Sequence, residues 1–141
     1  MARHLLLALL VLSAGPALAV GSRDAPASLD PAQAALDRQD WPGAIGLLNP
    51  IVQAEPRNAD ALNLMGYALR RAGMLEEAGA YYRAALAADP RHLGALEYQG
   101  ELFLQTGDRA GAEANLARLR DLCGGCEEEA DLAAAIGAAG S

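Results

Sequence analysis

The chain has 141 residues, a formal net charge of −7 at pH 7, and a composition that is 52% hydrophobic. It contains no lysine, and its 11 arginines are outnumbered by 18 acidic residues, which disfavours the clustered positive charge that a nucleic-acid partner requires. The length and composition argue against a nucleic-acid-binding protein and suit one domain with a modest core.

Residues 1–19 have the features of a secretory signal peptide. A basic start at Arg3 precedes an apolar run over residues 5–12, and small residues lead to a cleavage site after Ala19. The run is shorter than the roughly 20 residues of a spanning helix, so we expect cleavage and no stable membrane insertion. This pattern predicts a periplasmic or secreted protein in which residues 20–29 form a flexible linker.

After the linker, residue types recur at a spacing of 34 residues. The recurring pairs are Pro56 and Pro90, Leu62 and Leu96, Gly66 and Gly100, Gly73 and Gly107, and Ala78 and Ala112. Apolar residues between these positions recur at three- and four-residue intervals, which predicts amphipathic helices. A period of this length is typical of helix-turn-helix units that stack on copies of themselves to bury their apolar faces.

The clearest unit covers residues 59–90 and carries a characteristic order of small and apolar side chains. These are Leu62, Met65, Gly66, Leu69, Gly73, Ala78, Tyr82, Ala85 and Pro90. The set resembles the signature of the tetratricopeptide repeat family. A second copy over residues 93–122 keeps most of it, and a copy over residues 30–56 is degenerate in its first helix. The resemblance implies an all-α, right-handed α-solenoid over residues 30–122, followed by a short C-terminal helix within residues 123–141.

Two expectations about packing follow from the repeat pattern. Gly66 and Gly100 lack a Cβ, so the first helix of each pair is expected to approach the second helix of the same pair closely. Trp41 and Phe103 stand at repeat positions that predict burial in the core rather than stacking on a ligand.

In the family that the chain resembles, the first helix of each repeat lines a concave groove that holds another polypeptide. Matched position by position, the exposed groove residues would be Asp60, Asn63, Tyr67, Arg70, Arg71, Glu97, Glu101, Leu104 and Gln105. An aromatic ring beside two arginines suits a peptide carboxylate or an acidic segment. The Lys and Asn residues of the family's carboxylate-gripping clamp are absent. The resemblance therefore implies a protein-protein interaction module with a protein or peptide partner.

Catalytic groups are scarce. Beyond residue 19 the chain has His92 as its one histidine, together with one threonine and three serines. His92 follows Pro90 at an expected turn, where it is interpreted as a solvated residue. The acidic runs at residues 76–77 and 127–129 stand near helix starts, where the helix dipole favours them. We predict no enzymatic activity, no cofactor and no metal site.

Cys123 and Cys126 are the only cysteines, and Glu127, Glu128 and Glu129 follow them. Export favours a local disulfide that braces the C-terminal helix. A redox-active pair is an alternative, although acidic neighbours raise the pKa of a thiol. Metal binding is another, although a closed zinc site needs four ligands. The open alternatives are thus a thiol-disulfide redox or metal-handling protein, and a structural subunit that forms homo-oligomers because two to three repeats lie at the stability limit.

Overall fold

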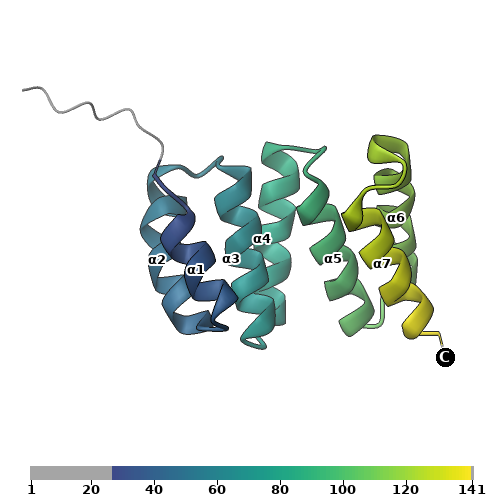
Figure 1. Cartoon of the computed structure of the whole chain (residues 1–141), viewed down its shortest axis with the longest axis horizontal. Coiled ribbons are helices and arrows are strands. Elements are labelled where there is room, and N and C mark those ends of the chain that lie inside the picture. The colour runs from purple at the N-terminus through teal and green to yellow at the C-terminus, as the bar shows by residue number, and fades with distance from the viewer. Residues whose placement is uncertain (1–26, 141) are drawn as a thin grey trace, which may run out of the picture.

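The computed structural model describes residues 27–140, which form seven α-helices and contain no strand (Figure 1). The helices are α1 (Asp30–Asp37), α2 (Trp41–Ala54), α3 (Ala59–Arg71), α4 (Leu75–Ala88), α5 (Leu93–Gln105), α6 (Arg109–Cys123) and α7 (Glu127–Ala138). None of these helices is both long and apolar enough to cross a bilayer. The predicted signal peptide over residues 1–19 lies outside the described residues.

The helices form pairs that stack side by side (Figure 1). Helix α1 packs with α2, α3 with α4, and α5 with α6, while α7 packs against both α5 and α6. The first helices, α1, α3 and α5, lie with α7 on one side, and α2, α4 and α6 form the layer behind them. This arrangement confirms the predicted all-α repeat solenoid. Helix α7 takes the place that the first helix of a further repeat would have.

The same spacing that defines the repeats also places the helix caps. Asn58 and His92, 34 residues apart, each accept a hydrogen bond of 3.0 Å from the backbone N–H three residues later. Asp40 and Asp108, two periods apart, accept equivalent capping hydrogen bonds at the starts of α2 and α6, at 3.0 and 2.9 Å. Each cap satisfies a donor at a helix start and contributes about 1 kcal/mol. Cys126 stands one further period after His92 and directly precedes α7.

A residue with a left-handed backbone conformation follows the end of each first helix. Gly73 and Gly107 have φ of 85° and 84°, while Gln39 stands at the same position of the first repeat with φ of 60°. In all three turns this residue donates its backbone N–H to the carbonyl three residues back, and the next residue donates to the carbonyl five residues back. That pattern ends a helix and requires a positive φ, which glycine adopts without strain and glutamine does not.

The two repeat glycines meet different neighbours. A Cβ on Gly66 would lie 2.7 Å from the ring of Tyr82 on α4, as expected for close approach within a helix pair. A Cβ on Gly100 would lie 2.6 Å from Leu132, so its nearest neighbour is α7 and not the partner helix α6. Gly100 thus meets α7 first, because α7 packs onto α5 through that position, while α5 and α6 still pack as a pair.

The prediction that Trp41 and Phe103 are core residues is correct only in part. Both side chains are half-buried, each packed against the edge of a buried cluster. Trp41 is the first residue of α2, so part of its ring faces the groove side at the turn from α1.

The end of the predicted linker has defined contacts. Leu29 packs against the main buried cluster, and the backbone N–H of Ala27 donates to a Glu55 carboxylate oxygen at 3.0 Å. That bond is the largest cause of a lowered pKa of Glu55. Residues 27–29 are thus attached to the end of α2.

Candidate binding groove

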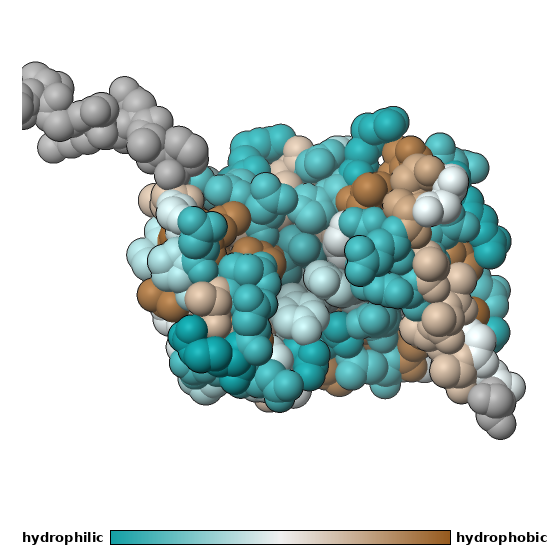
Figure 2. All heavy atoms as spheres, viewed as in Figure 1, coloured by the Kyte–Doolittle hydropathy of each residue, from teal (hydrophilic) through white to brown (hydrophobic). Residues whose placement is uncertain are grey.

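The first helices and α7 line one face of the solenoid. Figure 2 shows this face hollowed between α1 and α7, with hydrophilic side chains over most of its surface. Two pockets lie along it. One is between α1, α3 and α5, and the other is between α5 and α7.

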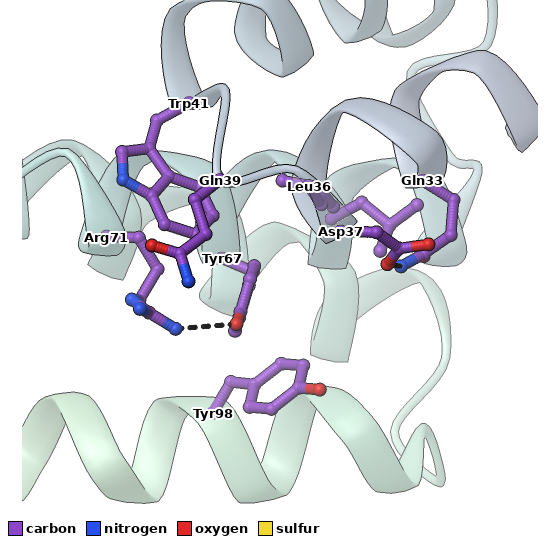
Figure 3. A pocket seen from close by; sticks show the side chains of 9 residues that line it. Gln33, Leu36, Asp37, Gln39, Trp41, Tyr67, Arg71 and Tyr98 are labelled. Atoms are coloured by element: carbon purple, nitrogen blue, oxygen red, sulfur yellow. Dashed lines mark hydrogen bonds between the residues drawn. The ribbon is translucent and has the colours of Figure 1, made fainter.

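The pocket near α1 has a volume of about 270 Å³. We call it the Trp41 pocket, and it is lined by Gln33, Leu36, Asp37, Gln39, Trp41, Leu64, Tyr67, Arg71 and Tyr98. Figure 3 shows Trp41, Gln39 and Arg71 at one end, and Asp37 with Gln33 at the other. Side chains from α1, the α1–α2 turn, α2, α3 and α5 therefore combine to form this one site.

Aromatic rings hold Arg71 in place within the Trp41 pocket. Its guanidinium carbon lies 4.6 Å from the centre of the Trp41 ring, and one guanidinium N–H donates to the Tyr67 hydroxyl at 2.8 Å (Figure 3). The Tyr67 ring lies 6.2 Å from the Trp41 ring and 4.8 Å from the Tyr98 ring. Burial raises the pKa of Tyr98 to about 12, so its hydroxyl stays protonated at neutral pH. Cation-π contact and the shared hydrogen bond fix the geometry of Arg71 before any ligand arrives.

Arg70 has a different role, although it neighbours Arg71 in sequence. Its side chain is 8% exposed and forms an ion pair with Glu101 on α5. A second guanidinium N–H donates to Gln105 at 3.3 Å. Arg70 therefore ties α3 to α5, and its charge is already matched within the protein.

Three of the predicted groove residues are buried rather than exposed. They are Asn63, Arg70 and Glu97, which are 6%, 8% and 7% exposed. Asn63 lies under the first turn of α5, where its side-chain nitrogen would be 3.2 Å from a Cβ on Gly94. The prediction of exposure fails here because each first helix is covered in part by the next helix along the solenoid.

Burial changes the chemistry of Glu97. Burial and repulsion from neighbouring carboxylates raise the pKa of Glu97 to about 8, and the charge of Arg70 opposes the shift. The carboxylates are those of Glu101, Asp131 and Glu128, the last two on α7. Glu97 thus holds its proton at neutral pH and presents no charge to a ligand.

The remaining predicted residues divide between the two ends of the groove. Tyr67 and Arg71 lie in the Trp41 pocket. Glu101, Leu104 and Gln105 line the second pocket, about 430 Å³, together with Arg70 of α3 and alanines near the end of α7. Only part of the predicted set is therefore brought together.

Asp60 lies outside both pockets at the edge of the groove. Its carboxylate is 2.9 Å from Nε2 of His92. Because Nδ1 of His92 accepts the capping bond at the start of α5, Nε2 carries the proton and donates it to Asp60. His92 is thus a half-buried cap that joins two repeats, and its interpretation as a solvated turn residue is wrong.

Several residues of the Trp41 pocket were not predicted from the sequence. Tyr98 stands three residues before Glu101 and shares its helix face, so helical spacing could have revealed it. Gln33, Asp37 and Gln39 could not have been found in this way, because they reach the pocket only through the packing of α1 against α3.

The cysteines lie at the α6–α7 junction, away from both pockets. Cys123 ends α6 and Cys126 precedes α7, with their Cα atoms 5.6 Å apart. Gly124 and Gly125 between them have φ of 50° and 112°, a tight turn that glycine permits. The described part of the chain holds no group of three or more His, Cys, Asp or Glu side chains placed to bind a metal.

Comparison with known proteins identifies the family. The sequence profile of the tetratricopeptide repeat matches residues 29–92 and 75–125, so the chain belongs to the tetratricopeptide repeat family. No curated protein matches it.

Solved structures share the fold. The TPR2B domain of yeast Sti1, in its pHsp70 complex, has 18% identity and a TM-score of 0.71, covering 78% of this chain and 90% of that one. The first TPR domain of Spaghetti (RPAP3), bound to an HSP90 peptide, has 17% identity and a TM-score of 0.70, covering 79% and 90%. The Thermobaculum terrenum O-GlcNAc transferase has 23% identity and a TM-score of 0.64, covering 67% of this chain and 18% of that chain. The family and the fold support a protein-protein interaction module.

Proposed function

We propose that the protein binds a peptide or an extended protein segment in its groove, with the Trp41 pocket as the main contact. The observation that carries this proposal is the prearranged set of Trp41, Tyr67, Arg71 and Tyr98 in one concave site. Aromatic and arginine side chains dominate the binding energy of protein interfaces. Because these rings already fix Arg71, little side-chain entropy is lost when a ligand binds.

A selection from a random-sequence peptide library tests this proposal. Peptides enriched on the purified protein should bind at least 30-fold more weakly to the double variant Tyr67→Ala, Arg71→Ala, because loss of one anchor commonly costs about 2 kcal/mol. Titration calorimetry measures the affinity, and circular dichroism checks that the fold is retained.

Arg57→Ala is the matched control, since Arg57 is exposed in the turn between α2 and α3, outside the Trp41 pocket. It should leave the affinity unchanged. Failure to enrich any peptide, or equal binding by the double variant, would contradict the proposed function.

We also propose that the protein is exported after cleavage behind Ala19. The support is the order of basic, apolar and small residues over residues 1–19. Intact-mass measurement of the protein from its own cells should give a chain that begins at Val20. A chain that begins at Met1 would contradict export by this route.

In the exported protein, we propose that Cys123 and Cys126 form a structural disulfide that braces the start of α7. Their proximity at the α6–α7 junction and the oxidising compartment support it. Replacing both by Ser should lower the free energy of unfolding by no more than about 2 kcal/mol, because the closed loop is very short. Insulin-reduction activity above background would favour the redox alternative instead.

A further inference from the structure

Gln39 occupies a backbone position that the other repeats give to glycine. The turn after α1 has the same hydrogen bonds as the turns that contain Gly73 and Gly107, and all three require a positive φ. Glycine would satisfy this turn without strain. A strained residue that persists at a candidate binding site suggests that its side chain is needed there.

The side chain of Gln39 lines the Trp41 pocket beside Arg71 (Figure 3). Its amide has no hydrogen-bond partner among residues 27–140. The amide therefore contributes nothing visible to the fold, although its N–H groups are available to a ligand.

Arg71 offers a charge that the described residues leave unmatched. Its hydrogen bond goes to the neutral hydroxyl of Tyr67, and no carboxylate of the described residues lies within 4.0 Å of it. Arg70, by contrast, is paired with Glu101. Asp37 lines the other end of the pocket, where Gln33 donates to it at 3.0 Å. One end of the Trp41 pocket thus gathers hydrogen-bond donors around a single positive charge.

We propose that Gln39 and Arg71 together select a carboxylate side chain, Asp or Glu, on the bound protein segment. A guanidinium binds a carboxylate through two parallel hydrogen bonds, and the Gln39 amide can donate a third. The ring of Tyr98 and the side chain of Leu64 border the same pocket and offer apolar surface to the methylene groups of an acidic side chain. This inference rests on the proposed function and specifies the chemistry of its ligand.

Because Gln39 strains its turn but is proposed to contact the ligand, replacing it should change stability and affinity in opposite directions. Gln39→Gly should raise the melting temperature by about 4 °C by removing the left-handed strain, and weaken binding of the selected peptides about tenfold. The reverse change Gly73→Gln is the control: it should lower the melting temperature by a similar amount and leave binding intact. A residue with a merely structural role would not separate stability from affinity in this way.

The peptides supply the second readout. The selected set should share an acidic residue, and its replacement by Asn or Gln should weaken binding to the wild type about 30-fold but leave the already weakened binding to Arg71→Gln unchanged. Peptides that bind through Tyr67 without a shared acidic residue, or a Gln39→Gly variant with wild-type affinity, would overturn the inference while the proposed function stands. If no peptide is enriched, both are overturned.

Discussion

The two ends of the groove are built from equivalent helix positions but differ in the side chains that line them. Near α1, Tyr67 and Arg71 border the Trp41 pocket. Near α7, Glu101 and Gln105, one period later, line the second pocket, while Glu97 is buried just as Asn63 is buried one period earlier. The comparison teaches that the packing of the next helix repeats along the solenoid and buries equivalent positions alike, while the residue type decides what chemistry each end of the groove offers.

The largest expected effect tests the packing within the α3–α4 pair, which lies between the two ends. Gly66→Leu should lower the free energy of unfolding by about 3 kcal/mol, because the new side chain must displace the fully buried ring of Tyr82. Gly46→Leu on α2 is the matched control, since nothing lies within 4 Å of a Cβ there and the change should be neutral or slightly stabilising. Thermal or urea unfolding measures both, and wild-type stability of Gly66→Leu would contradict the repeat alignment.

A slightly smaller effect should distinguish the α7 end from the rest of the solenoid. Leu132→Ala should cost about 2 to 3 kcal/mol because it leaves a cavity between α7 and α5. Hydrogen exchange should show increased opening of α7 with the α3–α4 pair unaffected. Leu47→Ala, at an exposed site on α2, should change stability by less than about 0.5 kcal/mol. An equal loss of hydrogen-exchange protection in all helices would mean that α7 does not open separately from the rest of the fold.

The smallest effect is a pH dependence confined to the α7 end. The pKa of Glu97 is about 8 in the folded protein, whereas the pKa of a glutamate in the unfolded chain is about 4.3. The raised pKa means that the folded state binds more protons between these values, so stability falls as pH rises through this range. We expect a loss on the order of 2 kcal/mol between pH 5 and pH 8.

Glu97→Gln should remove most of that slope, because the amide stays neutral at every pH. Glu113→Gln, at an exposed position on α6, is the control and should keep the slope. Urea unfolding at several pH values provides the measurement. A slope that persists in Glu97→Gln would show that another group is responsible, and Leu132→Ala should reduce it if burial under α7 is its cause.

Much of the fold could be predicted from the chain because its causes are local. The spacing of Leu62 and Leu96 gave the period, and the left-handed glycines gave the ends of the first helices. The site was harder to predict. Tyr67 and Arg71 were found because they stand on a first helix of a repeat. Gln39 was missed because the period places it only in a turn, and the tertiary packing alone brings that turn to the pocket.

The sequence by itself determined the helices, their caps and their order of stacking, since propensity, capping and apolar periodicity act over a few residues. The tertiary structure alone decided which side chains remain reachable. Asn63 and Tyr67 share a helix face in the sequence pattern, yet only Tyr67 borders the Trp41 pocket. The physical reason is that burial depends on the distance and tilt of the neighbouring helix, which are set by contacts such as that between Gly100 and Leu132, far apart in the chain.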